Sequence, residues 1–116
     1  MGTAHVFDTY EAIGQKPKKV MAVGGGTKNN IWMQATSDFS KIDQVVSEKS
    51  TGASYGNAFL AALAVGAVAE SDITRWNPAI TTIKTKHSAL HAEKNKLFRQ
   101  LYEDSKEIAH AVADPT

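Results

Sequence analysis

Three consecutive glycines, Gly24 to Gly26, are the residues of this chain best suited by type and position to bind a ligand. They stand in "VGGGTKNN" (residues 23–30), between an apolar run, "KVMAV", and a segment with helical character, "NNIWMQATSDF". Glycine lets a backbone approach a ligand closely, and the free N–H groups at a helix start attract anions such as phosphate. The alternative is a plain strand-to-helix turn capped by Thr27, and the spacing alone leaves both interpretations open.

Two standard nucleotide-binding patterns can be tested against this stretch. The P-loop requires Gly, four residues, Gly-Lys and then Ser or Thr, which "GGGTKNN" does not provide. The dinucleotide pattern Gly-x-Gly-x-x-Gly is met at Gly24 and Gly26, but Asn29 occupies its third glycine position. Glu48 stands near the end of the next predicted strand, about where an acid would bind a ribose. A small dinucleotide-binding module is therefore one open hypothesis.

Hydrophobic periodicity predicts the elements that position these glycines. Helices are predicted at 3–14, from 29 on, at 50–68 and at 89–112, and strands at 20–24 and 43–49. The helix at 50–68 is almost wholly apolar and is expected to be buried on most sides, while "TTIKT" (81–85) is a weak strand or an extended linker. The apolar face of the helix after the glycines is predicted to consist of Trp32, Ala35, Thr36 and Phe39.

A second pair of glycines, Gly52 and Gly56, also stands between a predicted strand and a predicted helix. Strands that alternate with helices indicate an α/β unit with parallel strands, so both glycine loops would leave the same C-terminal edge of the sheet. Two such loops on one edge favour a nucleotide ligand. With only two well-defined strands, the sheet keeps open edges, which indicates a part of a larger domain.

Composition excludes several classes of protein. The chain has 116 residues and a net charge of +1, which makes no electrostatic case for nucleic acid or an anionic membrane. It has no cysteine, and its longest apolar stretch, "AFLAALAVGAVA", is too short to span a bilayer. The N-terminus lacks the basic cluster of a signal peptide. A cytoplasmic protein is expected.

The two glycine stretches resemble the C-terminal domain of the FGGY carbohydrate kinases, the family that includes glycerol kinase and xylulokinase. "VGGGTKNNIWMQATSDF" and "STGASYGNAFLAALAVG" carry the resemblance, which runs from about residue 3 to 70 and weakens through the last helix. Asn57 departs from the alanine that is frequent in the family. The positions that match the family pattern are Gly24, Gly25, Gly26, Asn29, Gln34, Ser37, Asp38, Gly56 and Ala58.

This resemblance implies an α/β fold: a partial RNase H-like domain of the actin-like ATPase class, with a short parallel sheet flanked by helices. Residues 1–116 would be the C-terminal part of the nucleotide-side domain, without a complete second domain. Gly24, Gly25, Gly26 and Asn29 would border ATP, with Gly25 and Asn29 at contact positions. The full-length enzyme would use ATP and magnesium (Mg2+) to phosphorylate a sugar or polyol hydroxyl, with a xylulose-like substrate as the first candidate.

Family members are several times longer than this chain, and the resemblance assigns their catalytic base and sugar site to parts that precede it. The isolated chain is therefore expected to carry neither catalytic nor metal-binding residues and to be inactive alone. Its open sheet edges and partly apolar faces are expected to cause self-association. A packing or interaction domain without any ligand is the remaining alternative.

Other side chains have structural interpretations. His87 and His91, four residues apart, are expected to be a solvent-facing pair, because no third metal ligand is evident. Asp38 and Gln34 are expected to form structural hydrogen bonds. Trp32 and Phe39 are expected to belong to the core.

Overall fold

The protein, described here by a computed structural model that covers residues 1–113, is built on one three-stranded sheet. Strand β1 (Val20–Ala22) runs parallel to β2 (Gln44–Ser47), and β3 (Ala79–Ile83) pairs antiparallel with the other edge of β2. The predicted α/β class and its parallel pair of strands are confirmed. The segment left open between strand and linker forms β3, which covers the second edge of β2 and makes the sheet mixed.

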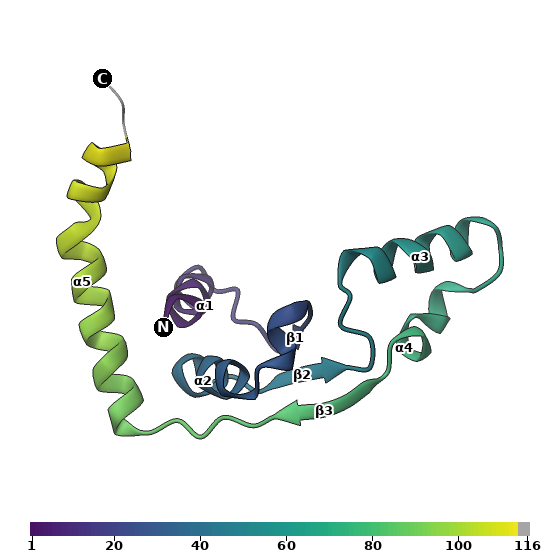
Figure 1. The fold of residues 1–116 in the computed structure, drawn as a ribbon, viewed down its shortest axis with the longest axis horizontal. Coiled ribbons are helices and arrows are strands. Elements are labelled where there is room, and N and C mark those ends of the chain that lie inside the picture. Colours follow the sequence, from purple (N-terminus) through teal and green to yellow (C-terminus); the bar gives the residue numbers. More distant parts are fainter. Residues whose placement is uncertain (114–116) are drawn as a thin grey trace.

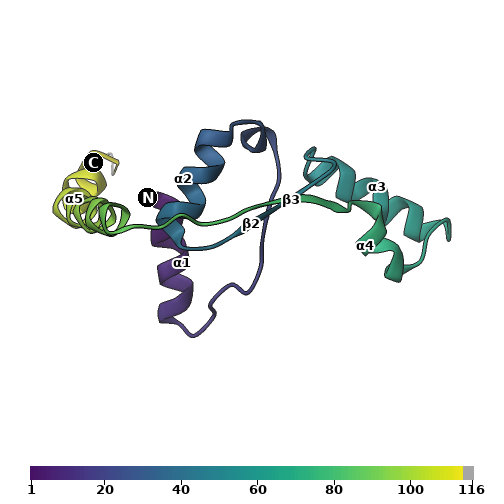
Figure 2. The ribbon, with the colours of Figure 1, turned by 90° about the horizontal axis from the view of Figure 1, so that it is seen from below.

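The helices form separate groups around this sheet (Figure 1). Helix α1 packs against α2 beside the strands, α3 and α4 lie together at one end, and α5 stands at the other end. Figure 2 shows the same groups from below, spread along the sheet rather than gathered over it. The helical segments are α1 (Gly2–Ala12), the 3₁₀ turn η1 (Gly25–Lys28), α2 (Asn30–Ser40), α3 (Ala53–Ala64), the 3₁₀ turn η2 (Glu70–Asp72), α4 (Ile73–Trp76) and α5 (Ala89–Ala113).

A polar seam joins α2 to the sheet. Met33 and Ser37, one turn apart on α2, are buried, and the Gln44 Nε2 group on β2 donates to the Met33 carbonyl and to Ser37 Oγ, both over 2.9 Å. Ser37 Oγ in turn donates to the carbonyl of Ile83 on β3 over 3.2 Å. The inward face of α2 is therefore set by these partners and not by the apolar positions. The core position predicted for Trp32 is wrong, since this residue is 64% exposed.

Helix α3 corrects another expectation. It buries only Phe59 among its residues, although it was predicted to be covered on most sides. The reason is that aromatic contacts with Trp76 of α4 cover one of its sides, while Leu60 is 60% exposed and Val65, just after the helix, is 80% exposed. The apolar stripe of α5 is likewise uncovered, with Leu97 51% exposed.

The chain is much more extended than a compact domain of its size. Its accessible surface is 8485 Å², whereas a compact 12.5 kDa monomer exposes about 6200 Å². Its radius of gyration is 18.2 Å, against about 13 Å for a compact domain of this length. The described residues therefore leave a large apolar surface uncovered. Within residues 1–113, no helix combines the length and the apolarity needed to cross a membrane.

Candidate functional site

The two glycine loops lie side by side at one edge of the sheet. Because β1 and β2 are parallel, the loop after Ala22 and the loop after Ser47 both leave from the carboxyl ends of their strands. The Gly24 N–H donates a hydrogen bond to the Ser50 carbonyl oxygen over 2.7 Å and joins the loops directly. The prediction that both loops share this edge is confirmed.

The three glycines of the first loop differ in what their positions demand. Gly24 has a φ of 91°, a conformation that favours glycine. Gly26 has an ordinary φ, and a Cβ atom there would stand 3.8 Å from Cε3 and Cζ3 of Trp32, a normal contact. Gly25 has neither an unusual backbone conformation nor a close neighbour. Its φ lies outside the left-handed region, and no described atom would come within 4 Å of a Cβ added there. The space in front of Gly25 is therefore open to an approaching ligand.

Two neighbouring N–H groups of this turn are free in the described part of the chain. The Gly24 carbonyl accepts the Thr27 N–H at 3.2 Å and Thr27 Oγ1 at 2.7 Å, which closes the turn. The N–H groups of Gly25 and Gly26 make no hydrogen bond with any residue in 1–113. Adjacent unpartnered N–H groups form a concave donor pair that suits an anionic oxygen. Thr27 stabilises this turn, and it does not cap α2.

Asn29 is the residue that caps α2. Its Oδ1 accepts the Trp32 N–H over 3.0 Å, and its own N–H donates to the Gly26 carbonyl over 3.1 Å. An asparagine amide has a separate donor group, Nδ2, which donates no hydrogen bond to the described residues. The exposed Asn29 side chain can thus stabilise the helix start and offer a donor to a ligand at the same time.

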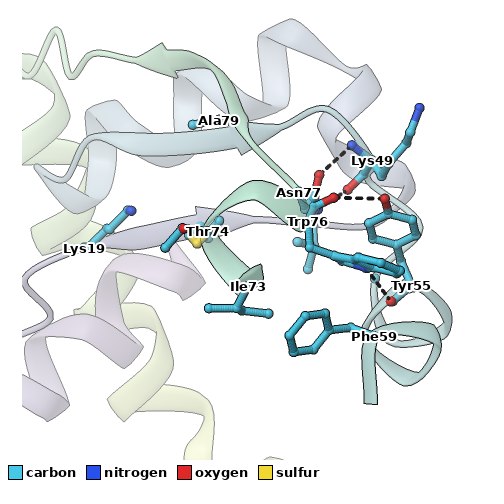
Figure 3. A pocket seen from close by; sticks show the side chains of 13 residues that line it. Lys19, Lys49, Tyr55, Phe59, Ile73, Thr74, Trp76, Asn77 and Ala79 are labelled. Carbon is cyan, nitrogen blue, oxygen red and sulfur yellow. Dashed lines mark hydrogen bonds between the residues drawn. The ribbon is translucent and has the colours of Figure 1, made fainter. Parts of the chain in front are cut away.

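Two cavities lie beside β1, the strand that leads into the glycine turn. One, of about 430 Å³, is bordered by Gly26 and Trp32. The other, of about 470 Å³, lies between β1 and the helices α3 and α4. Both fall in the size range of small-molecule sites. Val23, which leads into the glycines, borders both cavities. Figure 3 shows the aromatic side chains that line the second one, Tyr55, Phe59 and Trp76.

Asp38 ties α2 to the segment that precedes α5. Its Oδ1 accepts Gln34 Nε2 over 2.8 Å and the Lys86 N–H over 2.6 Å, and the residue is only 7% exposed. Burial raises the pKa of Asp38, but these hydrogen bonds and the nearby His91 and Lys86 outweigh burial and hold the pKa below its ordinary value. The structural hydrogen-bond role predicted for Asp38 and Gln34 is confirmed.

The two histidines are packed against α2, so the prediction of a solvent-facing pair is wrong. His87 Nδ1 lies 2.7 Å from the Asp38 carbonyl oxygen, and the His91 ring meets Phe39 edge-on with a centroid separation of 5.0 Å. The segment before α5 folds back over α2 and half-buries both rings. Among residues 1–113, no three His, Cys, Asp or Glu side chains gather as a possible metal site.

Two residues that organise the site were not singled out from the sequence. Ser50 acts through its backbone carbonyl, so its side chain carries no signal. Asn77 holds the second loop, since its Oδ1 accepts the Lys49 N–H over 2.9 Å and its Nδ2 donates to the Lys49 carbonyl over 2.8 Å (Figure 3). The dipeptide Asn77-Pro78 is typical of a turn, but the neighbouring sequence does not indicate that Asn77 bonds to Lys49, 28 residues away.

Both glycine loops lie within a family match. Residues 1–65 match the model of the FGGY family of carbohydrate kinases, C-terminal domain. This match covers more than half of the chain and contains the whole edge described above. The chain belongs to the FGGY family of carbohydrate kinases.

Solved kinase structures share its fold. A xylulose kinase from Rhodospirillum rubrum aligns with a TM-score of 0.74 at 21% identity, over 94% of this chain and 23% of that protein. A gluconate kinase from Lactobacillus acidophilus aligns with a TM-score of 0.60 at 20% identity, over 96% and 22%. A ligand-bound xylulose kinase from Lactobacillus acidophilus gives 0.56 and 21%, over 93% and 22%. The chain spans less than a quarter of the length of these kinases.

The sheet also bears on the dinucleotide hypothesis. A doubly wound dinucleotide fold continues with a parallel third strand, whereas β3 is antiparallel to β2. The Glu48 carboxylate, offered by that hypothesis as a ribose ligand, pairs with Lys49 Nζ over 2.8 Å. Neither feature supports a dinucleotide-binding module.

Proposed function

We propose that this chain forms one wall of the ATP site of a carbohydrate kinase. Residues 1–116 are the C-terminal part of the nucleotide-side domain, and the remainder of the kinase supplies the catalytic base and the carbohydrate site. The observation that carries this proposal is Gly25, which has a free N–H, open space before its Cα and no conformational need for glycine. Its absent side chain is explained if a ligand occupies that space.

The four residues of the turn have distinct roles in this proposal. Gly24 supplies the positive-φ backbone conformation with which the turn begins. Gly25 and Gly26 donate their N–H groups to an anionic oxygen of the nucleotide. Asn29 holds the start of α2 with Oδ1 and donates Nδ2 to the nucleotide. In this proposal Mg2+ accompanies ATP, and its protein ligands belong to the remainder of the kinase.

The proposed substrate of the whole kinase comes from its solved relatives. A carbohydrate hydroxyl of a xylulose-like sugar is the first candidate, and a gluconate-like acid is the second, because the solved relatives include kinases of both names. Nothing in residues 1–113 is proposed to contact the sugar. The whole protein is proposed to work in the cytoplasm, where ATP and sugar substrates are present.

Self-association belongs to the same proposal. The extended chain exposes apolar side chains on α3 and α5, and the outer edges of β1 and β3 are unpaired among the described residues. Surfaces of this kind bind other surfaces when they are left uncovered. We expect the isolated 116-residue chain to form dimers or larger species at tens of micromolar, whereas a monomeric mass by light scattering would contradict this expectation.

Substitution of Gly25 tests the proposed function. In the natural full-length protein that carries this sequence, Gly25→Val places a branched side chain in the open space without backbone strain. We expect ATP affinity to fall by about tenfold or more, equal to about 1.4 kcal/mol, with an unchanged melting temperature. Gly2→Val is the matched control, because Gly2 is equally open and has an ordinary φ, but lies on α1. Normal ATP binding by folded Gly25→Val protein would overturn the proposal.

A further inference from the structure

We infer that Asn77 is a positioning residue for the glycine turn and acts on it through the loop between β2 and α3; this inference rests on the proposed nucleotide site. The loop at residues 48–52 lies just beyond the regular part of the sheet. The pairing of β2 with β3 shifts register between Val46 and Ser47, where the ladder becomes irregular. Beyond such a break, a loop needs other partners to hold its shape.

Beyond the irregular pairing, the side-chain amide of Asn77 supplies the hydrogen bonds that the strand ladder no longer provides. It accepts the Lys49 N–H over 2.9 Å and donates to the Lys49 carbonyl over 2.8 Å. One planar amide thus engages both backbone groups of one residue, as the opposite residue of a paired strand does. Figure 3 shows the Asn77 amide, which lies between α4 and β3, directed at the Lys49 backbone.

The neighbours of Asn77 hold the same loop from both sides. The Glu48 N–H donates to the Pro78 carbonyl over 3.0 Å. On the other side, the Tyr55 hydroxyl donates to the Trp76 carbonyl over 2.9 Å, and Trp76 Nε1 donates to the Tyr55 carbonyl over 3.3 Å. The three residues 76–78 therefore fasten the loop from its first residue to the first turn of α3.

The loop passes this constraint to the glycine turn. Ser50 follows Lys49 directly, and its carbonyl accepts the Gly24 N–H over 2.7 Å. Because Asn77 fixes both backbone groups of Lys49, the carbonyl of the next residue, Ser50, has less freedom to rotate. This carbonyl holds the Gly24 N–H and thereby positions the free N–H of Gly25. Asn77 makes no described contact with the turn, so it positions the donors through Ser50. It also lies outside residues 1–65, which match the family.

The test uses the natural full-length protein with Asn77→Ala and, as a matched control, Gln100→Ala, which removes an exposed amide on α5. Two quantities are measured: hydrogen exchange of the Gly24 amide and the Kd for AMP-PNP, a non-hydrolysable ATP analogue. We expect Asn77→Ala, which loses both hydrogen bonds to Lys49, to speed Gly24 exchange and to weaken AMP-PNP binding about fivefold. The control is expected to change neither.

Other outcomes overturn the inference in distinguishable ways. Unchanged Gly24 exchange in Asn77→Ala shows that Asn77 does not hold the turn. Faster exchange with unchanged AMP-PNP affinity, in a protein whose Gly25→Val variant binds weakly, limits Asn77 to stability and leaves the proposed function standing. Unchanged affinity in both variants overturns the nucleotide site itself.

A second variant keeps the test decisive if Asn77→Ala does not fold. Asn77→Asp retains the acceptor for the Lys49 N–H and loses the donor to the Lys49 carbonyl. The carboxylate oxygen that replaces Nδ2 also repels the Lys49 carbonyl oxygen, so we expect faster Gly24 exchange and a Kd for AMP-PNP raised about threefold or more. Parent-like exchange at Gly24 together with parent-like affinity in Asn77→Asp counts against the positioning role.

Discussion

Asn29 Oδ1 accepts the Trp32 N–H at 3.0 Å, while Nδ2 of the same side chain donates no hydrogen bond within residues 1–113. One amide is thus divided between a helix cap and a free donor. The cap stabilises α2, whose first N–H groups lack intrahelical acceptors. The donor is the part proposed to meet the nucleotide. Because different atoms serve the two roles, substitution can separate them.

The first prediction compares Asn29→Asp with Asn29→Ala. Aspartate caps a helix as well as asparagine does, so Asn29→Asp should keep the melting temperature but weaken ATP binding, because it replaces a donor by a negative charge. Asn29→Ala should lose about 1 kcal/mol of stability with the cap and about 1 kcal/mol of ATP binding. Calorimetric melting and AMP-PNP titration measure both. Normal nucleotide affinity in Asn29→Asp would contradict the proposed contact.

The second prediction concerns the backbone of the turn. Gly24 has a φ of 91° and a ψ of 179°, a region that residues with a side chain avoid. Gly24→Ala should destabilise the protein by about 1–3 kcal/mol in urea unfolding. Gly26→Ala is the control, because its Cβ would meet the Trp32 ring at an ordinary 3.8 Å. Equal stability of the two variants would show that the Gly24 conformation carries no strain.

The third prediction uses the lowered pKa of Asp38. A carboxyl whose folded pKa lies below its unfolded value, about 3.9, stabilises the fold above that value. This contribution is lost as the pH falls through the folded pKa. Asp38→Asn removes the charge that Lys86 and Gln34 bind, so it should cost about 1–3 kcal/mol at pH 7.

The pH dependence of this loss is the sharper measurement. Below about pH 3.9 the unfolded chain binds a proton at Asp38 that the folded carboxyl resists, because its folded pKa is lower. The stability difference between the parent and Asp38→Asn should therefore shrink as the pH falls toward and through the folded pKa. Asp104→Asn on the exposed face of α5 serves as the control and should show little difference at either pH. Urea midpoints at pH 7 and pH 3 give both values. A difference that stays constant would mean that the Asp38 charge does not stabilise the fold.

The fourth prediction concerns activity. The 116-residue chain alone should show no carbohydrate-dependent ATP hydrolysis, since phosphoryl transfer needs a base, a metal and positioned phosphates together. A coupled assay with xylulose, gluconate and glycerol measures this, with circular dichroism to verify that the helices are formed. Turnover above background would show that the chain holds a complete active site.

Much of this protein was determined by local sequence alone. The order of the long helices and the first two strands, the strand-to-helix position of Gly24 to Gly26 and the edge they share with the second loop follow from short-range patterns. Such features are readable because periodicity and turn chemistry act over a few residues. The family resemblance rests on the same local motifs.

Tertiary structure alone decided the rest. Trp32 has the more apolar side chain, yet Ser37 is buried, because Gln44 and Ile83 offer Ser37 hydrogen-bond partners at the sheet. The direction of β3, the Gly24–Ser50 bond and the Asn77–Lys49 clamp depend on partners distant in the chain. A hydrogen bond between distant segments produces no periodic pattern in the sequence of either segment. It can be identified only in the folded chain, where each buried polar group has its partner.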